Sequence, residues 1–335
     1  MSKFAFIVDD CGVPSYYVKS GKGYKYNDNQ LLVEHSACFS NSTMIGMWSY
    51  PFIFDGCFLN WSEWGDSLPD YELETIIVAI EKNFDLYNVK KLRDKYPNAV
   101  IIGMIKEIFV GHDSAYGPTA NFESDKHKKR IEFLNQCDAI IQPFPKLEES
   151  PITHLINDCS DKNIVYVPFP VDVDYIYDKF YKEDRIESIF VYATPIHGRR
   201  ANTLEFSKYI SDKYGIPYYE KPKQINGFNV QLNQFYESWS KCTFHFNLDP
   251  VDWFPGSQAV QVASAGVINV GGLNASHNYL FPELATNDTN ILETKINKII
   301  TDQQFRIDVM THAFNKVHEL YSFDTVRKQI ESILS

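Results

Sequence analysis

The sequence lacks closely spaced cysteines and long apolar stretches. Six cysteines lie at positions 11, 38, 57, 137, 159 and 242 of 335, without any C-x-x-C pair. Such scattered cysteines are typical of buried thiols in a reducing compartment. No apolar run approaches the roughly 18 residues needed to cross a bilayer, and Met1–Phe4 enters an expected strand without the apolar core of a signal peptide. We therefore expect a cytoplasmic protein.

Positive charge is also scarce. The chain has 32 Lys and Arg against 43 Asp and Glu, which gives a net charge of −11. A protein that binds nucleic acid non-specifically needs a dense cationic face. The basic clusters here are short and lie at Lys126–Arg130 and Arg199–Arg200. The charge balance disfavours nucleic acid as a major partner and leaves room only for a local basic groove.

Several nucleotide and metal motifs are absent as well. No Walker loop, G-x-S-x-G elbow or G-x-G-x-x-G turn follows an expected strand. Asp172–Asp174 has the D-x-D form of some metal sites, but it lies where we expect a helix to start. The sequence indicates neither a metal nor another cofactor.

What the chain does contain is a regular alternation of short apolar runs and amphipathic segments. We expect strands at Phe4–Val8, Thr75–Ile80, Asn98–Met104, Cys137–Gln142, Ile164–Val167, Phe190–Ala193, Ile216–Tyr219, Thr243–Asn247 and Val267–Val270. We expect helices at Asp85–Tyr96, Lys126–Asn135, Asn202–Lys213, Gln231–Ser240, Ser257–Ala265, Ile291–Ile299, Asp302–Leu320 and Phe323–Leu334. Residues 44–61 show no clean period. The alternation predicts β-α-β units and parallel sheets.

Phe244–Gly272 contains the clearest candidate binding segment. Its expected strand ends before a loop with Pro250, Pro255 and Gly256, and the expected helix begins at Ser257 and Gln258. A helix N-terminus presents backbone N–H groups and a positive dipole end, and glycine allows close approach to the backbone. The segment therefore predicts a diphosphate site, although an ordinary β-α-β unit has the same spacing.

This segment resembles the donor-binding signature of the group-1 (retaining, family 4-like) glycosyltransferases of the GT-B type. Gly256 matches the family's loop glycine, and Gln261 occupies the position at which the family has a glutamate that binds the ribose hydroxyls. Gln can still hydrogen-bond a diol. Trp253, with Asp252 beside it, replaces the glutamate that supports the transferred sugar. Two readings follow: Trp253 stacks on the sugar while Asp252 contacts its hydroxyls, or the ring only packs the loop.

A second resemblance lies in Phe190–Arg200, where an expected strand is followed by Thr194, His197, Arg199 and Arg200. The family places a basic residue here to neutralise the departing pyrophosphate. Arginine suits that role because its planar fork binds phosphate oxygens in pairs. A cation at a helix start opposes the helix dipole, which favours an anion between the two arginines over a solvent-facing pair.

A third resemblance, from Cys137–Ile141 through Val165–Asp172, matches the end of the family's N-terminal domain. Together the three imply two doubly wound, Rossmann-like α/β domains that face a cleft. We expect an acceptor-side domain at 1–170, a linker at 171–185, and a nucleotide-sugar-binding domain at 186–320. Residues 321–335 are expected to form a terminal helix that crosses back to the first domain.

The expected activity is transfer of a sugar from a nucleotide-sugar donor to an unidentified acceptor hydroxyl. Asp10, Glu107, Asp113 and Asp252 are the candidate catalytic carboxylates. The alternatives are an epimerase or hydrolase on the same fold, a glycosyltransferase that modifies DNA bases, and a nucleotide-sugar-binding protein without catalysis. The sequence does not identify the sugar, the nucleotide base or the oligomeric state.

Overall fold

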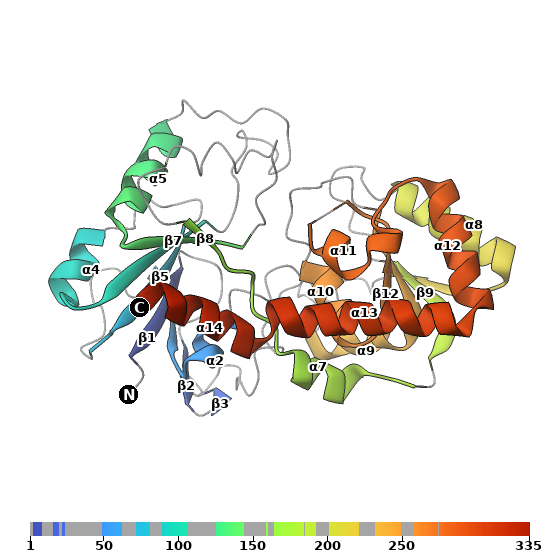
Figure 1. Ribbon diagram of the computed structural model, residues 1–335, viewed down its shortest axis with the longest axis horizontal. Helices are drawn as coiled ribbons and strands as arrows, with labels where there is room; N and C mark the ends of the chain where they lie inside the picture. Colours follow the sequence, from blue (N-terminus) through green and yellow to red (C-terminus); the bar gives the residue numbers. More distant parts are fainter. Residues whose placement is uncertain are drawn as a thin grey trace, which may run out of the picture. The chain divides into compact units, whose positions relative to one another are not determined.

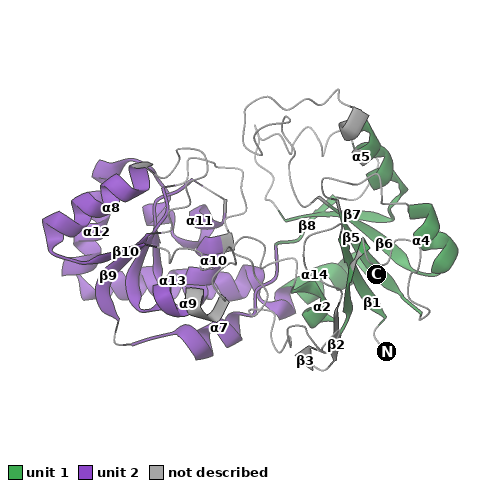
Figure 2. Ribbon diagram, turned by 180° about the vertical axis from the view of Figure 1, so that it is seen from behind, with its two compact units in different colours: residues 1–35, 48–168, 326–335 green, residues 36–47, 169–325 purple. Residues whose placement is uncertain are grey.

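The computed structural model describes residues 3–8, 16–19, 22–23, 49–61, 72–80, 89–105, 125–143, 159, 164–183, 185–191, 201–220, 232–248, 257–273 and 275–335. These residues belong to two compact units (Figure 2). The first unit contains the described residues up to Pro168 together with Val326–Ser335, and the second contains Phe169–Thr325. Each unit has its own sheet and its own core.

The sheet of the first unit follows the order β3-β2-β4-β1-β5-β6-β7-β8. Its strands are β1 (Phe4–Val8), β2 (Tyr16–Lys19), β3 (Lys22–Gly23), β4 (Cys57–Asn60), β5 (Thr75–Ile80), β6 (Val100–Ile105), β7 (Ala139–Gln142) and β8 (Ile164–Tyr166). The neighbouring strands from β4 through β1 and β5 to β8 all pair in parallel. Strand β2 instead pairs antiparallel with both β4 and β3. The five residues of β1, FAFIV, are all buried, as expected for a strand covered on both faces.

Short helices accompany this sheet: α2 (Tyr50–Ile53), α4 (Val89–Lys95), α5 (Asp125–Gln136) and α14 (Phe323–Leu334) (Figure 1). Arg93 on α4 donates to Asp138 at 2.8 Å and to the carbonyl of Gln136 at 3.0 Å, which ties α4 to the end of α5. Arg327 on α14 donates through Nε to the carbonyl of Ile53 at 3.0 Å. The last helix of the chain therefore packs with the first unit.

The sheet of the second unit has the order β10-β9-β11-β12, with all pairs parallel. Its strands are β9 (Ile186–Val191), β10 (Tyr218–Glu220), β11 (Cys242–Phe246) and β12 (Ile268–Val270). The helices are α7 (Val173–Phe180), α8 (Ala201–Tyr214), α9 (Leu232–Ser240), α10 (Ser257–Ser264), α11 (Ala275–Leu280), α12 (Thr289–Thr301) and α13 (Gln303–Tyr321), with the 3₁₀ turn η4 (Pro282–Leu284). Helix α10 packs against α13, α11 and α7.

Helix α7 lies within residues 171–185, the segment expected to be a linker. Its Val173, Ile176 and Phe180 are buried in the core of the second unit. Asp172 caps the helix by accepting from the backbone N–H of Tyr175 at 3.1 Å. The D-x-D triplet Asp172–Asp174 therefore forms the start of a helix, as predicted. No helix in the described part of the chain is long and apolar enough to cross a membrane.

Candidate functional site

The carboxyl ends of the strands in the second unit form the candidate site. Because the strands are parallel, β9, β11 and β12 end at the same edge of the sheet, at Val191, Phe246 and Val270. Open α/β sheets bind their ligands outside this edge. The elements that follow the strands, among them the first turns of α8 and α10, supply the groups that a ligand there would meet.

Helix α10 starts at Ser257, the residue predicted from the sequence. Its first turn is attached to the end of β11, because the side-chain amide of Asn247 donates to Oε1 of Gln258 at 3.4 Å. The backbone N–H of Leu248 donates in turn to Oγ1 of Thr203 on α8, at 3.1 Å. The end of β11 thus holds the first turns of both helices in place.

Gln261 lies one turn into α10 and is only 4% exposed. Its backbone carbonyl accepts from the N–H of Ala265 as the helix closes. A polar side chain is costly to bury without partners. Gln261 is therefore not a surface residue of α10.

The end of β12 is held by glycines in unusual backbone conformations. Gly271 has a φ of +81°, and a Cβ there would lie 2.7 Å from Cδ1 of Leu248. Glycine is therefore required both for its left-handed backbone and for the close approach of Leu248. Gly272 has a φ of +94°, and its N–H donates to Oδ1 of Asn287 at 2.9 Å.

A buried polar cluster lies beneath this turn. Nδ1 of His245 is 2.6 Å from Oδ1 of Asn269, so β11 and β12 are joined by side chains as well as by their ladder. Both nitrogens of His277 face backbone carbonyls: Nε2 lies 3.1 Å from that of Asn269, and Nδ1 lies 3.2 Å from that of Gly272. Burial lowers the pKa of His277 to about 4. The ring is therefore neutral at pH 7 and donates to one carbonyl only.

The sequence interpretation did not single out His245, Asn269 or His277. His277 has backbone carbonyls as partners, and these have no signature in the sequence. The Gly271-Gly272 pair directly after a buried strand was the signal that could have marked this turn.

Most of the predicted site residues lie outside the residues that the structure describes. On the donor side these are Thr194, His197, Arg199, Arg200, Asp252, Trp253 and Gly256, and on the acceptor side Asp10, Glu107 and Asp113. Of the predicted donor-binding residues, Ser257, Gln258 and Gln261 lie within α10. Within the described ranges, no group of three His, Cys, Asp or Glu side chains could hold a metal ion.

No protein-family model matches the chain, and no curated protein matches it. Solved structures do resemble it along its full length. HepE from Anabaena, solved in complex with UDP, aligns with a TM-score of 0.58 at 8% identity, covering 98% of this chain and 99% of that chain. An alpha-glucosyltransferase solved with UDP and a 13-mer DNA containing an HMU base gives 0.57 at 11% identity, covering 99% of each chain.

A glycosyltransferase from Rickettsia africae gives a TM-score of 0.55 at 10% identity, with 100% of each chain covered. At these identities the likeness concerns the fold. The predicted fold class, two Rossmann-like α/β domains of the GT-B type in one chain, is confirmed.

Proposed function

We propose that this protein is a glycosyltransferase that uses a nucleoside-diphosphate sugar as its donor. The observation that carries the proposal is the end-to-end likeness to two proteins solved with UDP, one of them an alpha-glucosyltransferase. Both units take part in that likeness, since 98% or more of this chain is covered. The donor's nucleotide is proposed to be UDP, and the acceptor is a hydroxyl group.

The second unit is proposed to bind the donor. The diphosphate would bind at the first turn of α10, to Ser257 and Gln258, and to Gly256 before it in the sequence, because a helix N-terminus offers N–H groups and a favourable dipole. The attachment of Gln258 to Asn247 supports this role by fixing the turn before a ligand arrives. Gln261 would hold the ribose hydroxyls, and its low exposure fits a side chain kept for a specific contact.

Arg199 and Arg200 would neutralise the pyrophosphate, with Thr194 and His197 contributing hydrogen bonds. In the transfer, the bond between the sugar's anomeric carbon and the pyrophosphate oxygen breaks, and the diphosphate leaves with the electron pair. A bond forms between that carbon and the acceptor oxygen, whose proton passes to a base. Two guanidinium groups stabilise the negative charge that develops on the leaving group.

The proton acceptor is proposed to be one of Asp10, Glu107, Asp113 and Asp252, since a carboxylate within reach of the acceptor hydroxyl can remove its proton. Trp253 would cover a face of the transferred sugar. A cytoplasmic location remains part of the proposal and rests on the scattered cysteines. The described ones, Cys57, Cys137, Cys159 and Cys242, are all buried, as expected for small apolar side chains.

The experiment is a donor-turnover assay with UDP-glucose, UDP-galactose and UDP-N-acetylglucosamine. Released UDP and the sugar product are measured with and without a mixture of saccharide acceptors. Glycosyl transfer predicts UDP release that rises when acceptor is present, together with a glycosylated product. Conversion to another UDP-sugar without UDP release would instead identify an epimerase. Acceptor-independent release of free sugar would identify a hydrolase. Binding of UDP without turnover would identify a binding protein.

A second candidate acceptor is a hydroxymethylated base in DNA, favoured by the likeness to the alpha-glucosyltransferase solved with HMU-containing DNA. The net charge of −11 opposes broad DNA binding. The same assay with a duplex containing hydroxymethyluracil, against an unmodified duplex, separates the two acceptor classes. Glucose incorporation into the modified duplex alone would support DNA as the acceptor.

A further inference from the structure

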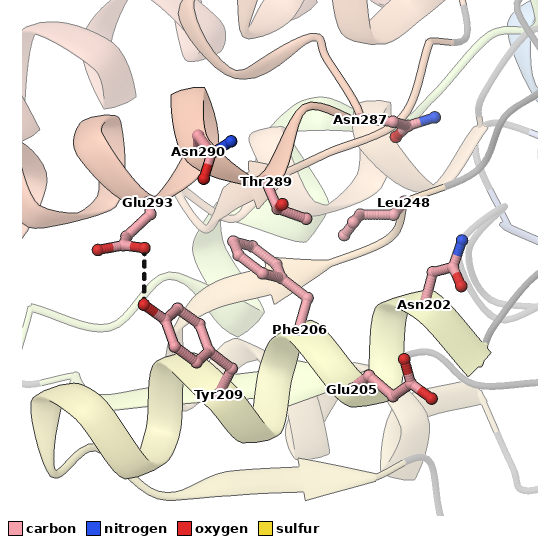
Figure 3. A pocket seen from close by; sticks show the side chains of 9 residues that line it. All are labelled: Asn202, Glu205, Phe206, Tyr209, Leu248, Asn287, Thr289, Asn290 and Glu293. Atoms are coloured by element: carbon pink, nitrogen blue, oxygen red, sulfur yellow. Dashed lines mark hydrogen bonds between the residues drawn. The ribbon is translucent and has the colours of Figure 1, made fainter.

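A groove opens in the second unit between α8 and α12 (Figure 3). Its volume is about 600 Å³. Helix α8 lines one side, the start of α12 lines the other, and Leu248, two residues after the end of β11, closes one wall. The lining residues are Asn202, Glu205, Phe206, Tyr209, Leu248, Asn287, Thr289, Asn290 and Glu293. All nine belong to the second unit.

Among the described residues that line the groove, none is cationic and two are carboxylates. Glu293 accepts a hydrogen bond from the Tyr209 hydroxyl at 2.9 Å and forms an ion pair with Lys213. The hydrogen bond from the Lys213 ammonium holds the pKa of Glu293 below its usual value. Within the described part of the chain, Glu205 has no ion pair. The described lining therefore has negative character, because of Glu205, and this disfavours phosphate. This electrostatic character separates it from a diphosphate site at the start of α10.

The remaining lining combines an apolar floor with amide and hydroxyl groups. The ring of Phe206 and the side chain of Leu248 are 5% and 4% exposed and lie between the two helices (Figure 3). Phe206 stacks with Phe246 and Tyr209, so only its edge reaches the groove. Three asparagines and Thr289 surround this floor. Apolar atoms can contact the C–H groups of a sugar, while amides and carboxylates pair with its hydroxyls as donors and acceptors. A sugar ring presents both kinds of surface at once.

The groove is held in shape by contacts on both sides. Asn287 accepts from the N–H of Gly272, and Asp288 caps α12 by accepting from the N–H groups of Asn290 and Ile291. On the other side, the N–H of Leu248 donates to Thr203 on α8. Because these contacts fix the walls without a ligand, little ordering is required when a small molecule binds.

We propose that this groove is a carbohydrate-binding subsite that takes a neutral saccharide unit, separate from the donor's diphosphate. The inference goes beyond the proposed function, because a saccharide here is not the transferred sugar. Glu205 and Asn290, from opposite sides, would hydrogen-bond its hydroxyls, and its C–H groups would lie against the apolar floor of the groove.

The test is ligand-observed NMR with glucose, maltose and N-acetylglucosamine, each titrated into the full chain. The pocket variant is Glu205→Ala with Asn290→Ala. Both side chains are exposed, so the fold should tolerate the change. The matched control is Asp212→Ala with Asn297→Ala, which removes the same kinds of group from exposed positions on α8 and α12 outside the groove.

At least one of the three saccharides is expected to bind, and the pocket variant should weaken it by about tenfold or more, since two polar partners are lost. The control variant should bind like the unaltered chain. The proposal is overturned if no saccharide binds, or if the pocket variant binds as well as the unaltered chain. Equal weakening by the two variants would also overturn it. UDP titrated into the same samples reports binding at the donor site. An unaltered chain that binds UDP normally but none of the saccharides would therefore overturn the saccharide groove without affecting the proposed function.

Discussion

The two units differ most in what they bury. Among the described residues of the first unit, the buried polar side chains are Ser49, Thr75 and Gln142. The second unit buries many more, namely Ser188, Thr203, Ser207, Ser240, Thr243, His245, Gln261, Ser264, Asn269, Ser276 and His277. The strands show the same contrast: β5 reads TIIVAI and β6 reads VIIGMI, whereas β11 reads CTFHF and β12 reads INV.

This contrast indicates a division of roles. Burying a polar group costs free energy unless it is hydrogen-bonded, so an apolar strand is the simpler way to build a sheet. In the second unit the buried polar groups at β11 and β12 make specific contacts that fix the strand ends, such as that between His245 and Asn269. In the second unit, buried polar contacts therefore fix the sheet edge at which we propose that the donor binds. The described sheet of the first unit is built mainly from apolar side chains.

The largest expected effect concerns the turn after β12. Gly271→Ala should lower the free energy of unfolding by about 3 kcal/mol, because it adds a left-handed backbone penalty to an overpacked contact with Leu248. Gly215→Ala is the control: Gly215 also has a positive φ, of +67°, but a Cβ there would meet nothing within 4 Å. That change should cost about 1 kcal/mol. Denaturant unfolding measures both, and equal losses would contradict the tight packing of this turn.

The next effect compares one buried amide from each unit. Asn269→Leu should cost about 2–3 kcal/mol, because the buried ring of His245 loses the hydrogen bond to Oδ1 of Asn269 at 2.6 Å. Gln142→Leu in the first unit should change stability by less than about 1 kcal/mol. Within the described structure, the buried Oε1 of Gln142 accepts no hydrogen bond. Equal costs would contradict the view that buried polar contacts stabilise the second unit more than the first.

A smaller effect concerns the pH dependence of the second unit. The pKa of His277 is lowered by burial from 6.5 to about 4 in the folded chain. The unfolded chain therefore binds more protons between these values, and stability falls as the pH falls through this window. Between pH 7 and pH 5, the unaltered chain should lose about 2 kcal/mol more than His277→Gln. Unfolding free energies of the two proteins at both pH values measure this difference, and parallel losses would contradict the neutral, buried ring.

The regular elements were largely predictable from the sequence. Strand β5 and helix α14 have the predicted bounds, and α10 begins at the predicted Ser257. These segments have either an unbroken apolar run or a clear helical period. Strand β9 begins at Ile186, four residues before the expected Phe190, because its first two residues are exposed and do not look like a buried strand.

Strand β4 was not predicted, although it lies next to β1 near the middle of the first sheet. It falls in residues 44–61, where aromatic and apolar residues of α2 and β4 follow one another without a period. Residues 171–185 are expected to be a linker in which a helix starts at Asp172–Asp174, and the extent of that helix was not predicted, although Val173, Ile176 and Phe180 recur at helical spacing. In that segment the many polar residues and tyrosines made the helical spacing of the apolar residues hard to recognise.

The candidate site was predictable only where one segment carries it. The start of α10 and Gln261 could be read from the sequence because strand, loop and helix follow one another. The lining of the groove between α8 and α12 could not, since Glu205 and Glu293 are far apart in the chain and meet only through the fold. The contacts of His277 are made to backbone carbonyls. Every residue has such a carbonyl, so the sequence does not indicate which ones the ring contacts.

The central claim is that the second unit binds the donor's diphosphate through Arg199 and Arg200. Calorimetric titration of UDP into the unaltered chain and into Arg199→Ala/Arg200→Ala tests it most directly. Lys182→Ala/Lys241→Ala, which removes the same charge from exposed positions of the second unit, is the control. We predict that the arginine variant loses about 2 kcal/mol or more of binding free energy, because charged hydrogen bonds contribute about 1.5–3 kcal/mol each. The control should bind UDP normally. An arginine variant that is folded and binds UDP as tightly as the unaltered chain would contradict the account.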